Sequence, residues 1–351
     1  MKKDYFEIFN NLEESETALT SPNDKVLIID GLNTFIRSFA VSPVTNDNGV
    51  HVGGISGSLL SIGYAIKMLQ PTRVIICFDG KGGSQRRRKL FPDYKANRMV
   101  RTKLNRTNSF VDKDSERQNM QMQIGRLIQY LELTPVQLIA PENIEADDSI
   151  AYLAKQVLTD SKIFIMSSDK DFIQLVDDRI AVWSPTKKRL YFKDDVLEDY
   201  KVPAHNYLMY RTLTGDKSDN IPGVRGTGIK TLQKRLPILF GEAPITVDDI
   251  IEASSDSDVK LLQSIHSSRE VLELNYKLMQ LSEVDISGSS KSKILHVADN
   301  EIPRLNPMQF KVMMIEDGIT GAFRNLEFWL RERFTVLDAQ ADLYNTSCNN
   351  A

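Results

Sequence analysis

Three stretches of the chain share one pattern, a nearly unbroken apolar run of β-branched residues that ends in an aspartate. They are VLIID (26–30), RVIICFD (73–79) and KIFIMSSD (162–169). Continuous rather than alternating hydrophobicity is typical of strands that are buried on both faces, as in a parallel sheet. The three runs therefore predict parallel β-strands with an acidic side chain at each carboxyl end.

Helical periodicity fills the segments around these strands. The helical patterns are SGSLLSIGYAIKML (56–69), QNMQMQIGRLIQYLEL (118–133) and ADDSIAYLAKQVL (146–158). Strand–helix alternation predicts an α/β fold with a Rossmann-like core, in which helices flank a central, mostly parallel sheet. Ligands of such sheets bind beyond the carboxyl ends of the strands, where the three aspartates are expected to meet.

The alternation stops after Tyr200, and helical patterns continue to the end of the chain. A polar segment, RMVRTKLNRTNSFVDKDSERQ (98–118), is expected to be a mobile loop or a marginal helix, and SGSSKSK (287–293) a flexible joint. The predicted organisation is an N-terminal extension (1–24), an α/β core with a basic region at 80–118 (25–200), a helical region (201–286), and C-terminal helices with a frayed tail (287–351).

Composition narrows the function classes. With two cysteines among 351 residues, a disulfide framework or a cysteine-rich zinc module is excluded. No apolar run reaches the roughly 18 residues of a membrane span, and the acidic N-terminus has no signal-peptide core, so we expect a cytoplasmic protein. The net charge of −3 conceals a basic segment, since ten basic residues and one acid lie between Lys81 and Arg106. This separation of charge predicts a local anion-binding surface.

The stretch NIEADDSIAYLA (143–154) places three carboxylates in front of a helix, more than a helix dipole requires. A single strand-end aspartate is usually a turn former or a cap, but three such strands together with EADD weigh against that interpretation. Two like charges about 4 Å apart repel by roughly 4 kcal/mol at an effective dielectric near 20, and hard cations such as Mg²⁺ or Mn²⁺ remove this cost. Beside a basic segment, the pattern indicates metal-assisted attack of water on a phosphodiester. The candidate carboxylates are Asp30, Asp79, Glu145, Asp147, Asp148, Asp169, Asp171, Asp216 and Asp219.

Four motifs occur in order along the chain: FDGKGGSQRRRKLFPDYKANR (78–98), EADD (145–148), SSDKDFIQLV (167–176) and GDKSDNIPGVRGTGIKT (215–231). Between residues 25 and 240 the chain resembles the 5′ nuclease (flap endonuclease) superfamily. This family includes the 5′-to-3′ exonuclease domain of bacterial DNA polymerase I, phage 5′ exonucleases and the T-even phage ribonuclease H, to which VWSPTKKRLYF (182–192) is also similar. The resemblance implies a PIN-like core and a helix–three-turn–helix region that binds DNA.

The resemblance also implies roles for individual residues. A first metal cluster would comprise Asp30, Asp79, Glu145, Asp147 and Asp148, and a second Asp169, Asp171, Asp216 and Asp219. Lys95 and Arg98 would reach the scissile phosphate, Tyr94 would stack on a base, and Arg86, Arg87, Arg88 and Lys89 would contact phosphates. The loop 99–117 would correspond to the arch of relatives.

The segment GVRGTGIKT (223–231) resembles the helix–three-turn–helix motif that holds a duplex backbone. Gly223, Gly226 and Gly228 would let backbone amides approach phosphates, and Lys230 and Lys234 would add charge. In the family the carbonyls of this turn also hold K⁺. Relatives usually have a short apolar residue at the position of Thr227. This departure puts the fine packing of the turn in doubt, but not the presence of the motif.

The sequence therefore predicts a monomeric, Mg²⁺-dependent 5′ nuclease, encoded by a phage or a bacterium, that acts as an exonuclease, a flap endonuclease and a ribonuclease H. Its partners would be DNA with 5′ flaps, nicks or ends, and RNA–DNA hybrids. The C-terminal region beyond residue 240 is expected either to complete the duplex platform or to bind a replication protein such as a single-strand-binding protein or a clamp. Two alternatives stay open. One is a branched-DNA binding module that does not cut, and the other is a PIN-type ribonuclease of single-stranded RNA.

Overall fold

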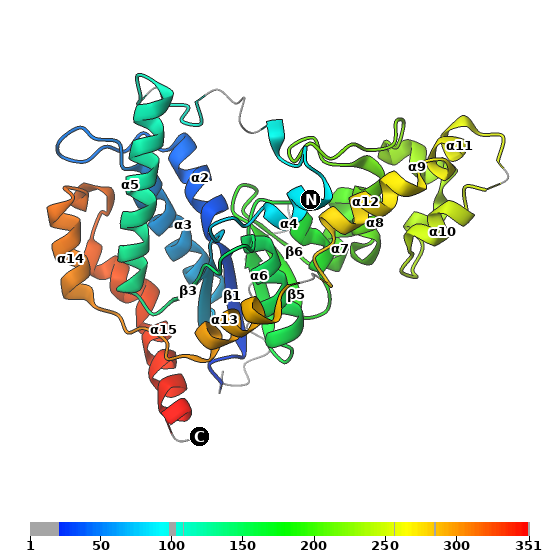
Figure 1. Ribbon diagram of the computed structural model, residues 1–351. Coiled ribbons are helices and arrows are strands. Elements are labelled where there is room, and N and C mark those ends of the chain that lie inside the picture. Colours follow the sequence, from blue (N-terminus) through cyan, green and yellow to red (C-terminus); the bar gives the residue numbers. More distant parts are fainter. Residues whose placement is uncertain (1–20, 98–102, 108, 256, 284–285, 350–351) are drawn as a thin grey trace.

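The computed structural model describes residues 21–97, 103–107, 109–255, 257–283 and 286–349. One six-stranded sheet lies at its centre, with the strand order β3-β2-β1-β4-β5-β6 (Figure 1). The strands are β1 (Lys25–Asp30), β2 (Arg73–Cys77), β3 (Gln137–Ile139), β4 (Lys162–Met166), β5 (Ile180–Ser184) and β6 (Arg189–Tyr191). All pairs are parallel except β5–β6, which is antiparallel. The predicted α/β class with a mostly parallel sheet is confirmed.

Helices make up most of the rest of the described chain. The α-helices are α2 (Gly31–Val41), α3 (Gly53–Leu69), α4 (Gln85–Leu90), α5 (Lys113–Glu132), α6 (Ala146–Tyr152), α7 (Lys193–Tyr200), α8 (Tyr207–Thr214), α9 (Ile229–Arg235), α10 (Val247–Glu252), α11 (Lys260–His266), α12 (Arg269–Met279), α13 (Gly288–Asp299), α14 (Pro307–Glu316) and α15 (Leu326–Asn349). A π-helical turn, η2 (Leu153–Val157), extends α6, and short 3₁₀ segments are η3 (Asp171–Leu175), η4 (Ala204–Asn206), η5 (Pro237–Phe240) and η6 (Thr320–Ala322). Among the described residues, no helix is both long and apolar enough to cross a lipid bilayer.

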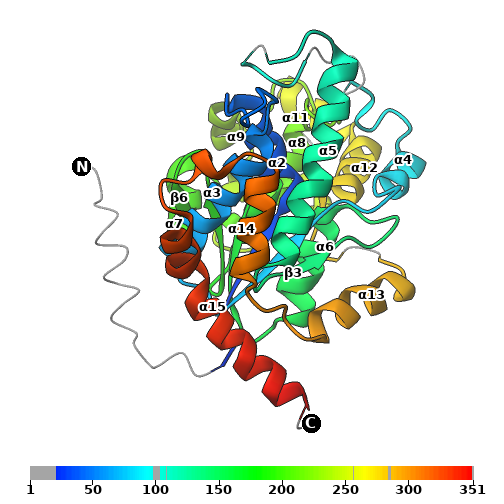
Figure 2. The ribbon, with the colours of Figure 1, turned by 90° about the vertical axis from the view of Figure 1, so that its left-hand side faces the viewer.

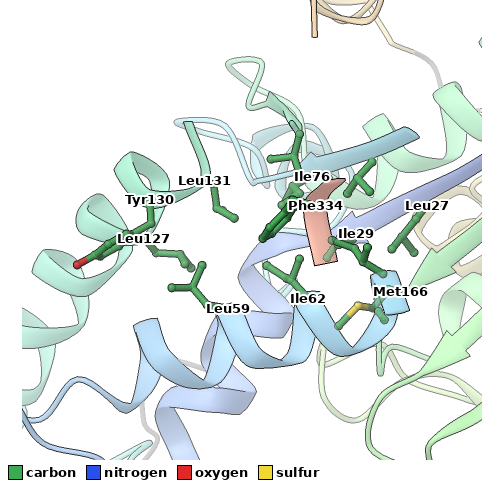
Figure 3. Close-up of a cluster of buried hydrophobic side chains, with 14 of the residues drawn as sticks. Leu27, Ile29, Leu59, Ile62, Ile76, Leu127, Tyr130, Leu131, Met166 and Phe334 are labelled. Atoms are coloured by element: carbon green, nitrogen blue, oxygen red, sulfur yellow. The ribbon is translucent and has the colours of Figure 1, made fainter. Parts of the chain in front are cut away.

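Both faces of the central strands are covered, which explains their continuous apolar runs. On one face Leu27 and Ile29 of β1 belong to a core that includes α3, α5 and α15. Figure 3 shows Leu59, Leu127 and Phe334 reaching this core from the three helices. The alternate β1 residues, Val26 and Ile28, belong to a second core on the other face, with α6 and α13. A strand with two buried faces cannot alternate apolar with polar residues.

The predicted helices exist, with different boundaries. The pattern at 56–69 belongs to α3, which starts earlier, and the pattern at 146–158 is α6 with its π-helical turn. In the polar segment 98–118 the helical alternative holds for the last residues, because α5 already begins at Lys113. The Asp112 side chain accepts from the Ser115 backbone N–H at 2.7 Å and caps that helix. A cap of this kind starts a helix ahead of the apolar pattern.

A helical lobe of α8–α12 projects from the sheet, on the right in Figure 1. It has its own core, in which Leu213, Leu232, Ile250 and Leu272 are fully buried. This lobe carries the segment that resembles a helix–three-turn–helix motif. It lies inside the predicted region 201–286, whose limits stay a prediction.

The C-terminal helices do not extend this lobe. Helices α14 and α15 pack on the face of the sheet that α3 and α5 cover, at the other side of the molecule from α9–α11 (Figures 1 and 2). Residues 241–286, which include α10–α12, do pack in the lobe with α9, so the contribution of the chain beyond residue 240 to a duplex platform stays a prediction. The segment SGSSKSK is also no joint, since the Ser287 hydroxyl accepts from the Ser290 N–H at 3.2 Å and starts α13. The tail expected to fray continues α15 to Asn349.

Candidate metal and nucleic-acid site

Asp30 lies at the middle of the carboxyl edge of the sheet, as the last residue of β1. Its carboxylate accepts hydrogen bonds from the Asn33 backbone N–H and from the Ser167 hydroxyl, each at 3.0 Å. Burial raises the pKa of Asp30 to about 7, and the negative charges of Asp169 and Asp79 act in the same direction. The charged form of Asp30 is thus disfavoured without a neighbouring cation.

Asp147 and Asp169 are close enough to Asp30 for their charges to interact. Burial raises the pKa of Asp147 well above its usual value, and Asp169 and Asp30 raise it further, while Lys95 opposes them. Burial likewise raises the pKa of Asp169, assisted by the charge of Asp219. The first turn of α6 and the β4 end therefore deliver two carboxylates to the edge where β1 ends.

Asp79 joins this edge through α6. It follows β2 by two residues, and its Oδ1 accepts from the Ala146 backbone N–H at 2.7 Å. This contact ties the loop after β2 to the first turn that carries Asp147. The predicted convergence of acidic strand ends is present in the structure.

Glu145 and Asp148 face a buried arginine. Arg87 of α4 donates from Nη2 to Asp148 Oδ1 at 2.6 Å and from Nη1 to Asp148 Oδ2 at 3.0 Å, and it pairs with Glu145. Lys95 Nζ lies 2.5 Å from Glu145 Oε1, and the Ser84 hydroxyl donates to the same oxygen. Burial opposes the charge on Glu145, but Arg87 and Lys95 outweigh it and hold its pKa at about 2.

This arrangement corrects the prediction for Arg87 and constrains the one for Asp148. Arg87 is 3% exposed, so it cannot be the phosphate contact expected from its basic neighbours. Arg87 bonds to both oxygens of Asp148, so Asp148 would bind a cation only by exchanging this partner, and its place in the first metal cluster stays a prediction. The charge pattern alone did not reveal that one arginine of the run points inward.

The second predicted cluster also contains a basic side chain. Arg211 of α8 donates from Nε to Asp171 Oδ1 at 3.1 Å and pairs through Nη2 with Asp216. Burial and the charge of Asp169 raise the pKa of Asp171 to about 7, against the effect of Arg211. Burial also opposes the charge on Asp216, but the Ser218 hydroxyl and Arg211 prevail and lower its pKa. Sequence reasoning missed Arg211, although a lone basic residue in YLMYRTLT (207–214), five positions before Asp216, was a usable signal.

The donor chemistry of this edge fits hard divalent cations. All the candidate ligands are carboxylates, and Asp30, Asp147 and Asp169 carry raised pKa values that a cation would lower. Within the described ranges no three acidic, histidine or cysteine side chains lie close enough to hold an ion as they stand. Arg87, Lys95 and Arg211 compensate part of the negative charge instead. Cation binding thus requires carboxylates to change partners.

The basic residues of 80–98 differ in exposure. Arg88 and Lys89 are exposed on α4, whereas Arg86 is half-buried with Nη2 3.4 Å from Asp148 Oδ1. Lys95 is half-buried beside Glu145, and Arg98 lies outside the described residues, so its role stays a prediction. Tyr94 is 3% exposed, and its hydroxyl donates to Asp219 Oδ2 at 3.2 Å. Its ring packs against protein and offers no face to a base, which contradicts the predicted stacking.

The 223–231 segment forms a turn that leads into α9. Gly226 has φ +91°, a conformation that favours glycine, and Gly228 is exposed with open space where a side chain would begin. Gly223 differs, because a Cβ there would lie 2.1 Å from the Thr214 carbonyl oxygen. This glycine is therefore required for the close approach of the turn to the end of α8, and its contact with phosphate stays a prediction.

Thr227 fits the turn despite its hydroxyl. The side chain is 5% exposed, and Oγ1 donates to the Val224 carbonyl at 2.7 Å. Lys230 and Lys234 are exposed on α9 as predicted, and two exposed basic residues that the sequence analysis omitted, Arg225 and Arg235, lie in and after the turn. The lobe thus presents four cations at this turn and helix.

Comparison with known proteins gives a consistent set of relatives. Residues 25–201 match the family model described as the 5′-3′ exonuclease, N-terminal resolvase-like domain. The chain is 30% identical to the 5′-3′ exonuclease of Bacillus subtilis over 74% of this chain and 83% of that protein. It is 29% identical to the 5′-3′ exonuclease of Aquifex aeolicus over 82% of this chain and 91% of that protein. It is also 31% identical to the DNA polymerase I of Thermus filiformis, over 86% of this chain but 34% of the polymerase.

Solved structures share the fold. The flap endonuclease of bacteriophage T5, crystallised with DNA and metal ions, superposes with a TM-score of 0.62 at 22% identity, over 78% of this chain and 99% of that one. The flap endonuclease-1 of Methanococcus jannaschii gives a TM-score of 0.50 at 15% identity, over 91% of this chain and 94% of that one. The PIN-like fold expected from the sequence is the fold of these nucleases.

Proposed function

Because the chain belongs to the 5′-3′ exonuclease family and is a nuclease, we propose that it is a magnesium-dependent, structure-specific 5′ nuclease. It removes 5′-terminal nucleotides or flaps from duplex ends and nicks, and RNA from RNA–DNA primers, in Okazaki-fragment processing or repair. One observation carries this proposal. Asp30, Asp147 and Asp169, whose pKa values are raised, meet at the carboxyl edge of the sheet, with Lys95 beside them. Carboxylates gathered in this way favour a cation-dependent reaction over DNA binding alone.

The ligands would divide into two groups. Asp30, Asp79, Glu145 and Asp147 would hold one cation, and Asp169, Asp171, Asp216 and Asp219 another. Asp148 could join the first group only by exchanging its pair with Arg87. Bound Mg²⁺ would supply Lewis-acid chemistry, which lowers the pKa of water and offsets charge on the phosphate.

The chain's own basic residues position the nucleic acid. The Lys95 ammonium, already 2.5 Å from Glu145, is placed to stabilise charge that builds up on the scissile phosphate, with Arg98 as its predicted partner. The exposed cations Arg225, Lys230 and Lys234 are suited to phosphates of the duplex and read no base sequence. Recognition is therefore of the shape of the substrate.

The test is one digestion series with purified protein. A 5′-labelled flap, a nicked duplex, an RNA–DNA hybrid and a single-stranded RNA are each incubated with Mg²⁺, with Mn²⁺ and with EDTA. We expect cleavage of the first three with either cation and none with EDTA. Binding without cleavage would favour the DNA-binding module, and a preference for unpaired RNA would favour a PIN-type ribonuclease.

A further inference from the structure

Two loops that are more than a hundred residues apart in sequence are bonded to each other. The first, residues 91–97, carries Lys95, and the second, residues 215–221, carries Asp216 and Asp219. The Lys95 backbone N–H donates to the Asp219 carbonyl at 2.9 Å. The Asn97 Nδ2 donates to the Lys217 carbonyl at 2.8 Å, and the Asn220 Nδ2 donates to the Asp93 carbonyl at 3.0 Å. Each loop thus supplies one asparagine that reaches the backbone of the other.

An apolar contact supports the same junction. Tyr94 of the first loop and Ile221 of the second are buried together with Leu278 and Met279 at the end of α12. The contact fixes the two loops to a helix of the lobe, and the asparagine bonds lie on the more exposed side. The junction is therefore built from both packing and directed hydrogen bonds.

The junction holds Lys95 in an unusual backbone conformation. Its φ is +58°, in the left-handed region that side chains other than glycine, asparagine and aspartate seldom adopt. Asn220 is also left-handed, with φ +63°, which asparagine tolerates. A strained residue persists only where its surroundings fix it, and here the bond from Lys95 N–H to Asp219 is one such constraint.

We propose that Asn97 and Asn220 are positioning residues for Lys95. By joining the two loops, they keep the Lys95 ammonium on Glu145 and at a set place relative to the loop of Asp216 and Asp219. Substrate phosphate and the second group of carboxylates are thereby aligned before DNA binds. The inference rests on the proposed function through the role of Lys95. It also links the motifs YKANR and GDKSDNIPG, since Asn97 of the first donates to Lys217 of the second, and Asn220 of the second donates to Asp93, directly before the first.

Hydrogen–deuterium exchange tests the junction without any reaction. Asn220→Gly keeps the left-handed backbone accessible and removes the amide that reaches Asp93, and Asn97→Ala removes the other. Gln70→Gly is the matched control, because Gln70 is an exposed residue with φ +44° at the end of α3. In metal-free protein without DNA, we expect the peptide that contains the Lys95 amide to exchange at least about tenfold faster in both asparagine variants and at the wild-type rate in the control. Unchanged exchange in both asparagine variants would overturn the proposal.

A double-mutant cycle tests whether the asparagines act through Lys95. Each asparagine substitution should lower kcat on a flap substrate by about tenfold or more with little change in KM. In a Lys95→Ala background the same substitutions should cause no further loss, because the residue they position is absent. Equal losses in both backgrounds would refute positioning through Lys95. If Lys95→Ala itself left cleavage unchanged, the role of Lys95 in the proposed function would fail, while the exchange experiment would still decide whether the junction exists.

Discussion

Arg87 offers the sharpest test of the energetics of the site. It is a buried guanidinium that pairs with two buried carboxylates, Glu145 and Asp148. We expect Arg87→Gln to destabilise the metal-free protein strongly, because the substitution leaves both carboxylates without their main counter-charge. Removing one partner of a buried ion pair typically costs about 3–5 kcal/mol.

The structure gives a second route to this magnitude. Glu145 is 2% exposed, and its pKa is held at about 2 instead of the ordinary 4.5. Such a difference corresponds to about 3 kcal/mol of stabilisation at neutral pH, of which Arg87 supplies the largest favourable share and Lys95 and Ser84 the rest. Since the folded-state pKa is depressed, this contribution is fully present above pH 4.5 and is lost as the pH falls from there towards 2. The effect of Arg87→Gln should therefore shrink across that window.

Urea unfolding measures the effect, with the buried Trp183 and Trp329 as fluorescent reporters and EDTA present so that no cation replaces the guanidinium. We expect Arg87→Gln to lose about 3 kcal/mol at pH 7. Arg88→Gln, at the exposed neighbouring position, should change stability by less than about 0.5 kcal/mol. Adding Glu145→Gln to Arg87→Gln should recover part of the loss. If Arg87→Gln and Arg88→Gln were equally stable, the reasoning about the buried pair would be refuted.

Three further outcomes are expected. Because burial raises the pKa values of Asp30 and Asp171 to about 7, Mg²⁺ binding should release protons, and the affinity for Mg²⁺ should increase from pH 6 to pH 8. Calorimetry in two buffers of different ionisation enthalpy measures the number of protons released and the affinity. An affinity that does not change with pH would contradict this prediction. Asp147→Ala should abolish flap cleavage with only a modest loss of DNA affinity, and near-normal turnover in a cleavage assay would count against a catalytic role. Replacing both Lys230 and Lys234 with Ala should reduce the slope of log DNA affinity against log salt concentration by about 2. Anisotropy titrations at several salt concentrations measure this slope. The control Lys162→Ala, at the opposite end of the sheet, should leave the slope unchanged.

The sheet was predictable where strands are buried on both faces. β1, β2 and β4 have that environment, and their unbroken apolar runs are its direct consequence. β3 and β6 have three residues each and sit at the two edges, so neither produced a comparable pattern. β5 is buried on both faces and carries the apolar run IAVW, yet it was not predicted as a strand. Helix α2 was missed for a different reason. Its N-cap is Asp30, a residue that the sequence analysis had already assigned to the acidic cluster, and one side chain serves both roles.

The acidic edge was predictable because parallel strands must deliver their ends to the same side of a sheet. The basic side chains that pair with these carboxylates were not predictable. Arg87 and Glu145 are 58 positions apart, and their pairing depends on how α4 folds back over the first turn of α6. Nothing in the run RRRK distinguishes the inward residue from its exposed neighbours. The burial of Tyr94 has the same origin, since it depends on contact with Ile221 of a distant loop.

Helix α15 has a consequence for how this protein can be altered. Trp329, Phe334 and Leu337 lie in the same core as Leu27 and Ile76 of the central strands. A version trimmed back to the segment shared with the family model would keep α3 and α5 on that side of the sheet but uncover the apolar surface that α15 buries, and exposed apolar area of this kind promotes self-association. Fusion partners or affinity tags should therefore be appended after the last turn of this helix, and minimal nucleases should not be sought by cutting before Leu326.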